Sequence, residues 1–390
     1  MDHEAALLSA GKLAQVAGEH ADEGERLRRL AAPVAEAMID SSLGRLVAPS
    51  ALGGGAAHPA TMVAVIETVA RADPSAGWCL GIGMGSNYLS GLVPRSAAAT
   101  LFGDLDRLGC GPFAPTGRAV IQGDNTVCVS GRWAFTSNCH QRGVMACGVT
   151  RSDNDTPAPG ADGPPRFELA FLTGEQYDIL ETWDTVGMRA TGSHDTVASN
   201  VVMSDDRFAG LFDPSWSDDP LFRLRSFDVL GPCLSPVTLG IGQAALDLVV
   251  QAAHEDRRSG ARPSLPNDVV MQAEYGRADA QLRSARLLLA DALDASWGHA
   301  ERGDTPPREA SALIGLANLA AVAAATRAID TAARVLGTAS IREGAPLERL
   351  RRDLDTARQH IIFAPAVEAP LGRQLAGVLT VAPPLLPPPS

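Results

Sequence analysis

The sequence predicts an α+β protein in which a helical segment comes first, a β segment follows, and a second helical segment ends the chain. Apolar residues recur at three- and four-residue steps in the first hundred residues, which is the period of an amphipathic helix. Short β-branched stretches follow, and long alanine-rich runs come last. We therefore expect an N-terminal helical domain (1–108), a central β-domain (109–213), a C-terminal helical bundle (214–382) and a proline-rich tail (383–390).

The N-terminal region is expected to contain several helices separated by one long loop. Ala5–Ala17, Glu23–Met38 and Pro59–Ala72 show helical spacing of apolar residues. Ser41–Gly55 contains a proline and three successive glycines, which break that spacing and predict a loop. Asp73, followed by a proline and a serine, is placed to cap the next helix.

The capped helix carries the sequence SAGWCLGIGMGSNYLSGL, with glycines at 81, 83 and 85. These glycines resemble a phosphate-binding loop only in spacing, because no strand precedes them and they lie within an apolar run. Close packing of the helix against a neighbour, or close approach of a flat ligand to its backbone, explains them better.

The central region contains at least five short strands, which favours a small sandwich or barrel. Gly123–Asn125 separates two of them as a hairpin turn, and Asp153–Pro165 is a low-complexity surface loop. The expected strands are Ala119–Gln122, Thr126–Ser130, Val144–Val149, Phe167–Leu172 and Thr196–Met203.

The C-terminal region is predicted to be an antiparallel four-helix bundle. Leu239–Asp256, Asp268–Trp297 and Glu309–Leu336 are long amphipathic runs, and Gly337 is placed as a C-terminal cap. Residues 317–333 (ANLAAVAAATRAIDTAA) have short side chains on nearly all sides. We expect this helix to pack at a subunit interface, because a monomer would leave it uncovered.

Composition excludes several functions. The chain of 390 residues has a formal charge of −12, which argues against nucleic acid or an anionic membrane surface as partner. The N-terminus lacks a basic flank before an apolar centre, and we count no run of about eighteen apolar residues. Six scattered cysteines without a CxxC pair predict reduced thiols in the cytoplasm. No metal-ligand spacing, P-loop or GxSxG motif is present.

Arg349–His360 (RLRRDLDTARQH) is the stretch with the most chemistry. On a helix, the spacing of Arg349, Asp353, Thr356 and His360 places all four side chains on one face. This face is either a solvated surface with a lone histidine or the wall of a cavity.

Four segments resemble the acyl-CoA dehydrogenase family, in the order in which that fold uses them. They are VAP (47–49) with ETVARADPSAGW, GRWAFTS (131–137), TWDTVGMRATGSHD (182–195) and VLGTASIREGAPLERLRRD. The resemblance covers nearly the whole chain and implies a flavin held non-covalently between the β-domain and the bundle, in a homotetramer. It also implies a catalytic glutamate eight residues after Asp353, where this chain has Ile361. An isoleucine cannot remove a proton.

A second branch of the fold fits better. FAPTGRA (113–119) and RLRRDLDTARQHIIFAPAVEAPLGRQLAG resemble two-component flavin-dependent monooxygenases, in which a histidine follows the Arg-Asp pair as His360 does here. This resemblance implies that reduced flavin (FADH2 or FMNH2) arrives from a separate reductase and that O2 is used to hydroxylate or N-oxygenate a small molecule, through a flavin hydroperoxide. The alternatives are a dehydrogenase of acyl thioesters with a displaced base, and a non-catalytic subunit of an oligomer.

The resemblance also implies the site residues. His360 would polarise the peroxide or take the substrate's proton, Asp353 would orient His360 or pair with an arginine, and Asn87 would bind substrate or peroxide.

Trp133 would cover one face of the flavin, and Thr136 and Ser137 would offer hydroxyls and backbone N–H groups to the edge of its ring. Arginines at the end of the first long helix of the bundle would bind the flavin phosphates from a neighbouring subunit. The competing interpretations are a helix-capping histidine, a core tryptophan and a solvated basic turn. The cofactor-binding residues expected in this way are Trp133, Phe135, Thr136, Ser137, Arg258 and Arg262. The sequence leaves open the substrate, FAD against FMN, and carbon against nitrogen oxygenation.

Overall fold

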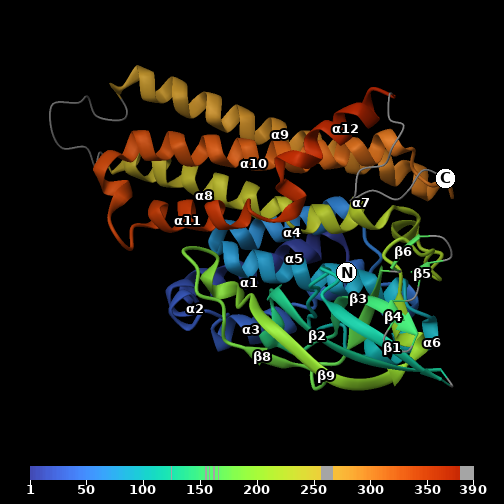
Figure 1. Cartoon of the computed structure of the whole chain (residues 1–390). Coiled ribbons are helices and arrows are strands. Elements are labelled where there is room, and N and C mark those ends of the chain that lie inside the picture. The colour runs from blue at the N-terminus through green and yellow to red at the C-terminus, as the bar shows by residue number, and fades with distance from the viewer. Residues whose placement is uncertain are drawn as a thin grey trace.

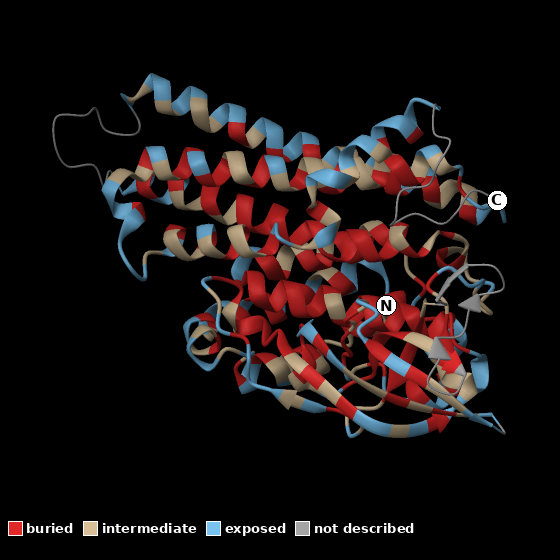
Figure 2. Cartoon of the chain, in the orientation of Figure 1, coloured by how far each residue is buried: buried red, intermediate tan, exposed pale blue. Residues whose placement is uncertain are grey.

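The computed structural model of the chain describes residues 1–123, 125–153, 156–157, 159–160, 163–165, 167–255 and 267–377. Figure 1 shows the helical bundle on one side and the sheet on the other, with helices α4 (Pro59–Ala72) and α5 (Pro74–Tyr88) between them. These two helices are mostly buried, as the red ribbon in Figure 2 shows. The helix–strand–helix order predicted from the sequence is confirmed.

The N-terminal helices follow the predicted pattern with one break. Glu23–Met38, expected as one helix, is two, because Arg28 adopts a left-handed φ of 55° and Pro33 sits at the start of the second. Asp73 caps α5 as predicted, since its carboxylate accepts the Ser75 N–H at 3.0 Å. The other helices here are α1 (His3–Glu19), α2 (Ala21–Leu27), α3 (Ala32–Asp40) and α6 (Arg95–Leu101).

The glycines of α5 allow close packing against neighbouring segments, which was one of the two interpretations of the sequence. A Cβ at Gly81 would lie 2.1 Å from the carbonyl oxygen of Cys233, and one at Gly83 would lie 2.5 Å from Leu108 Cβ. Neither distance is compatible with a side chain, so α5 can approach its neighbours only with glycine at these positions.

The β region forms one eight-stranded mixed sheet and a separate two-stranded sheet. Along the large sheet the order is β10-β7-β3-β1-β2-β9-β8, with β4 paired to β3. The predicted hairpin is present between β1 and β2, although Asp124 lies outside the described residues. The strands are β1 (Gly117–Gly123), β2 (Thr126–Thr136), β3 (Met145–Asp153), β4 (Thr156–Pro157), β5 (Pro159–Gly160), β6 (Gly163–Pro165), β7 (Phe167–Leu172), β8 (Asp178–Leu180), β9 (His194–Ser204) and β10 (Phe208–Ala209).

The C-terminal bundle is built from three long helices and three shorter ones. Asp268 caps α9 by accepting the Met271 N–H, and Gly337 ends α10 with a φ of 61°, as predicted. The tail 383–390 lies outside the described residues. The helices of this region are α7 (Ser226–Leu230), α8 (Ser235–His254), α9 (Val269–Glu301), α10 (Arg308–Leu336), α11 (Pro346–Ala357) and α12 (Glu368–Leu375).

The alanine-rich helix α10 is already covered within one chain. It packs against α8, α9, α11 and α12, and its alanines at 317, 321, 325, 328 and 332 are completely buried. A single chain thus buries these alanines, and the subunit interface predicted for this helix stays a prediction. Short side chains let three long helices approach closely, which explains the composition without a second subunit.

Two helical segments of the bundle are long and apolar enough to cross a membrane, although the sequence showed no run of about eighteen apolar residues. Within the described part of the chain, they are Ser226–His254 and Arg308–Ile341. Within the molecule, 72% and 50% of their most apolar windows are buried. Burial against other helices of the same chain identifies them as core helices.

Candidate active site

His360 does not lie on the helix that precedes it. Helix α11 ends at Ala357, and His360 follows as the N-cap of a short 3-10 turn, Ile361–Phe363, with extended backbone (φ −64°, ψ 142°). The prediction that His360 shares one helical face with Arg349, Asp353 and Thr356 is therefore wrong. The break turns the imidazole away from the line of the helix.

The His360 ring lies among aromatic side chains. Its centroid is 5.7 Å from that of Trp78, on α5, and 6.4 Å from that of Phe363, both in edge-on arrangements. Burial lowers the pKa of His360 to about 4, so the ring is neutral at physiological pH.

The tautomer of His360 follows from its cap contact. Nδ1 accepts the backbone N–H of Ile362 at 3.4 Å, and a nitrogen that accepts carries no proton. In the neutral ring the proton then lies on Nε2. His360 is thus built to donate a hydrogen bond from Nε2, which favours positioning of an oxygen atom over removal of a substrate proton.

Asp353 does not contact His360 in the described structure. Its Oδ1 accepts the backbone N–H of Met188 at 2.5 Å, and its Oδ2 lies 3.7 Å from Arg349 Nε. Of the two roles predicted for Asp353, pairing with an arginine is confirmed and orienting the imidazole is not observed. Burial raises the pKa of Asp353 to about 7. The folded state thus keeps a proton that the unfolded chain loses above about pH 4, and this contribution to stability is lost as the pH rises to about 7.

Trp133 is a core residue. Its side chain is completely buried in the sheet, and its indole N–H donates to the Gly148 carbonyl at 2.7 Å. A Cβ at Gly117 would lie 2.2 Å from the ring, so the strands close directly over it. The prediction that Trp133 covers a flavin face is therefore wrong, because the ring has no exposed face.

Phe135, two residues later, is the aromatic ring of this segment that faces outward. The β2–β9 register shifts between Trp133 and Thr136, and within that bulge Phe135 takes a left-handed φ of 59°. Its side chain is 73% exposed, with the Trp183 ring 6.2 Å away at 90°. A bulky residue in this conformation is strained, and such strain concentrates at functional sites. An outward aromatic ring held this way fits a planar flavin ring.

Thr136 and Ser137 are not free to offer their hydroxyls to a ligand. Thr136 is buried and shares a hydrogen bond with Thr196 at 2.9 Å. Ser137 shares one with Ser193 at 2.7 Å and accepts the Trp78 indole N–H at 3.2 Å. The prediction that these hydroxyls reach a flavin edge is not supported by the described contacts.

Asn87 has a structural role. Its amide donates to the Gly44 carbonyl at 3.0 Å and to the Leu105 carbonyl at 2.8 Å, and the side chain is buried. It thereby ties the loop after α3 to the end of the N-terminal domain. The predicted contact of Asn87 with substrate or peroxide is not supported by the described contacts, because both N–H groups of its amide are used within the chain and the side chain is buried.

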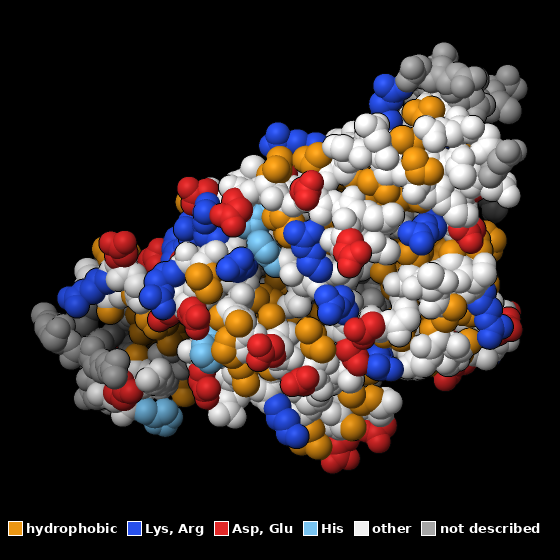
Figure 3. All heavy atoms as spheres, turned by 90° about the horizontal axis from the view of Figure 1, so that it is seen from below, with side chains coloured by type: hydrophobic (Ala, Val, Ile, Leu, Met, Phe, Trp, Pro, Cys, Tyr) orange, Lys and Arg blue, Asp and Glu red, His pale blue; other side chains and the backbone are white. Residues whose placement is uncertain are grey.

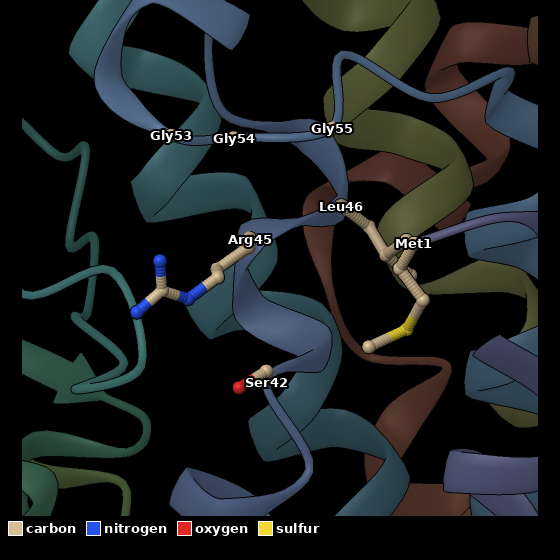
Figure 4. Close-up of a pocket in the computed structure, with 7 residues that line it drawn as sticks. All are labelled: Met1, Ser42, Arg45, Leu46, Gly53, Gly54 and Gly55. Carbon is tan, nitrogen blue, oxygen red and sulfur yellow. The ribbon is translucent and has the colours of Figure 1, made fainter. Parts of the chain in front are cut away.

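A small hollow lies at the loop that Asn87 anchors. Figure 4 shows it between Met1 and residues 42–55, with the Met1 and Leu46 side chains facing each other. Its volume is about 70 Å³, and Arg45 in its wall is paired with Asp106 at 2.6 Å. No residue that we expected at the active site lines it, so it is a surface feature of the N-terminal domain.

The remaining predicted residues divide into those described and those not. Arg258 and Arg262, expected at the flavin phosphates, lie outside the described residues. Ile361, at the position of the dehydrogenase base, is 59% exposed. Among the described residues there is no group of three or more His, Cys, Asp or Glu side chains that could hold a metal ion. The face in Figure 3 mixes acidic and basic side chains.

Sequence reasoning missed two aromatic residues that the structure brings to this region. Trp78 lies in the buried glycine-rich helix, and Trp183 lies in the loop that follows β8. In the sequence, the role of Trp78 or Trp183 is indicated only by the presence of an aromatic residue in a segment that resembles the family. Neither could be tied to His360 or Phe135 without the three-dimensional arrangement.

Comparisons with known proteins are consistent with this site. Residues 232–365 match the family described as Acyl-CoA dehydrogenase, C-terminal domain. The chain is 31% identical to indole-3-acetate monooxygenase of Pseudomonas putida, over 87% of this chain and 85% of that protein. It is 25% identical to the flavin-dependent monooxygenase oxygenase subunit HsaA of Rhodococcus jostii, over 88% and 90% of the two chains.

A solved structure agrees in fold. XiaF from Streptomyces, in complex with FADH2 and glycerol, superposes with a TM-score of 0.88 at 27% identity, over 99% of this chain and 97% of that one.

Proposed function

Because this chain belongs to the flavin-dependent monooxygenases that share the acyl-CoA dehydrogenase fold, we propose that it oxygenates a small aromatic compound, with an indole ring as first choice. It acts as the oxygenase component, with reduced flavin from a separate reductase and O2. The observation that carries the substrate proposal is the 31% identity to an indole-3-acetate monooxygenase over 87% of the chain. The XiaF complex supports FADH2 as the flavin.

The residues of the site suit this reaction. Reduced flavin, when bound, supplies the electrons that activate O2 for transfer of one oxygen atom. Phe135 and Trp183 would hold the flat ring, and Trp78 with Phe363 would keep water from the side on which His360 lies. His360 would donate from Nε2 to an oxygen atom of the substrate or the oxidant, and its neutral state at physiological pH suits that task.

The two alternatives are less well supported. A dehydrogenase of acyl thioesters needs a carboxylate at the site, and the expected position holds the exposed Ile361. Glu368, the next acidic residue along the chain, begins α12 and is exposed. A non-catalytic subunit would have no reason to retain a strained, exposed phenylalanine and a half-buried, neutral histidine.

The test of the substrate proposal is turnover with a defined reductase. The purified chain, given FAD, a flavin reductase, NADH and O2, should convert indole-3-acetate or indole to a product heavier by one oxygen atom, measured by mass spectrometry. Incubation with ¹⁸O2 should place the label in that product. Monocyclic phenols under the same conditions are the control for ring preference. A product from phenols but not from indoles would overturn the indole assignment.

We also propose that the chain forms a cytoplasmic homotetramer. Helix α9 lies on the outside of the bundle in Figure 1, and it exposes Val269, Val270 and Leu287, each more than 60% accessible. These side chains supply an apolar contact face for a second subunit. Sedimentation at micromolar concentration should give about four times the chain mass of 40.6 kDa. A stable monomer would contradict the proposal.

A further inference from the structure

A chain of buried hydrogen bonds crosses three parts of the fold. The Trp78 indole N–H donates to Ser137 at 3.2 Å, Ser137 bonds Ser193 at 2.7 Å, and Ser193 bonds Thr191 at 2.6 Å. Thr191 then donates its hydroxyl to the Met188 carbonyl at 2.8 Å. All five residues are at most 8% exposed. This series of hydrogen bonds therefore runs through buried side chains from α5, past the end of β2, to the loop before β9.

The direction of every link in this chain is fixed. The Met188 carbonyl can only accept, so the single Thr191 proton goes to it and Thr191 must accept from Ser193. The Ser193 proton is then used, so Ser193 accepts from Ser137, and the Ser137 oxygen in turn accepts the Trp78 N–H. Hydrogen bonds aligned head to tail strengthen one another.

The backbone of Met188 joins a second branch of hydrogen bonds to the first. Its carbonyl also accepts the indole N–H of Trp183 at 3.0 Å. Its own N–H donates to Asp353 Oδ1 at 2.5 Å, across the boundary between the β-domain and the bundle. Met188 has a left-handed φ of 52°, and a Cβ at neighbouring Gly187 would lie 2.0 Å from the Arg352 carbonyl oxygen. The loop is thus pressed against α11 at this point.

We propose that Asp353 is a positioning residue for the oxygenation, and that it fixes both aromatic walls of the site through the backbone of Met188. One branch ends on Trp183, beside Phe135, and the other ends on Trp78, beside His360. The inference rests on the proposed function, because it assigns a role in that reaction. Asp353 thereby acts on His360 through the indole that the imidazole contacts, and not by a direct bond.

The charge on Asp353 is set by its neighbours. Arg349 faces it on α11, and the same guanidinium lies 3.3 Å from Asp73, at the start of α5, and 3.5 Å from Glu25, on α2. Asp22 also lies 3.3 Å from Arg349. Several carboxylates thus share one cation. Burial raises the pKa of Asp353 to about 7; Arg349 and the Met188 N–H oppose this rise, and the carboxylates of Asp73 and Glu25 add to it. Ionisation makes its oxygen a stronger acceptor for the Met188 N–H.

Two substitutions act differently on the two branches, and two more serve as controls. Ser193→Ala cuts only the branch to Trp78, because it removes the acceptor for Ser137 and the donor to Thr191. Asp353→Asn keeps an oxygen for the Met188 N–H but removes the charge, so it acts on both branches. Ser226→Ala is the matched control, since this buried hydroxyl, on α7, donates to the Leu211 carbonyl at 2.6 Å and bonds the Tyr88 side chain, outside both branches. Ser193→Thr restores the hydroxyl.

The readout is ¹⁹F NMR of full-length protein labelled with 5-fluorotryptophan, which has five signals for five tryptophans. Trp78→Phe and Trp183→Phe assign two of them. Ser193→Ala should shift the Trp78 signal alone, Asp353→Asn should shift both, and Ser226→Ala should shift neither. In the unsubstituted protein both signals should titrate near pH 7, and in Asp353→Asn neither should.

The same variants are assayed for product formed per O2 consumed. We expect Ser193→Ala and Asp353→Asn to lower this ratio by roughly tenfold at saturating flavin, since misplacement of a reacting group is costly. Ser193→Thr and Ser226→Ala should keep it. An unchanged Trp78 signal or an unchanged ratio in Ser193→Ala would overturn the inference. If the unsubstituted protein makes no product from any compound, the proposed function fails, and the NMR signals still decide whether the chain of bonds exists.

Discussion

Replacing His360 with alanine should lower product formation about a hundredfold while O2 consumption continues. Reduced flavin reacts with O2 without help, so the oxygen that is no longer transferred should appear as hydrogen peroxide. Folding and flavin binding should change little, because His360 lies in a short turn beyond the end of α11. Chromatography measures the oxygen that is transferred to product, and a coupled assay measures the oxygen that is released as hydrogen peroxide.

Two further variants test what His360 does. His360→Gln keeps a side-chain N–H donor, so it should retain more product than alanine if the Nε2 proton is what the reaction needs. Ile361→Glu restores the carboxylate of a dehydrogenase, and oxidation of an acyl-CoA by this variant would identify the chain as a relative that lost its base. Between pH 7 and 5 the contribution of His360 should stay constant, because its pKa is about 4. If His360→Ala makes as much product and as much peroxide as the unsubstituted protein, the imidazole only caps the turn and has no part in the reaction.

Substituting the two aromatic residues of the β2 bulge should have opposite effects. Trp133→Ala should lower the free energy of unfolding by about 3–5 kcal/mol, because it removes a buried indole and leaves the Gly148 carbonyl without its donor. Phe135→Ala should leave unfolding nearly unchanged and weaken flavin binding by about 1 kcal/mol, or roughly fivefold in Kd. Denaturant unfolding and flavin titration measure the pair.

The controls for this pair keep the ring and change its size. Trp133→Phe should recover part of the lost stability, and Phe135→Tyr should bind flavin as the unsubstituted protein does. If Phe135→Ala binds flavin normally while Trp133→Ala folds normally and does not bind it, the assignment of the two rings is reversed.

The sequence was sufficient for the order of elements because periodicity and capping are local. Pro59–Ala72 was predicted to the residue, and Asp73 and Gly337 cap their helices as expected. The spacing of Gly81 and Gly83 correctly pointed to close packing, since a glycine within an apolar helix has few other uses.

The site was harder to predict because side-chain direction depends on irregular backbone. A two-residue bulge decides that Trp133 points into the sheet and Phe135 points out, and alternation along a regular strand does not predict it. The end of α11 at Ala357 removes His360 from the face it was assigned, although the sequence shows no glycine or proline there. Asn87 and Asp353 were assigned to the site by resemblance to a family. The sequence could not show that each of them binds a backbone group far away along the chain.

The left-handed backbone of Phe135 has a consequence for engineering. A non-glycine residue held at such a φ costs about 1–3 kcal/mol, and glycine at this position would recover much of that cost. A variant library screened only for heat tolerance would therefore enrich glycine or asparagine at residue 135 and discard the exposed ring. A screen for catalytic turnover would enrich the opposite choice, so robustness and activity of this protein must be selected together.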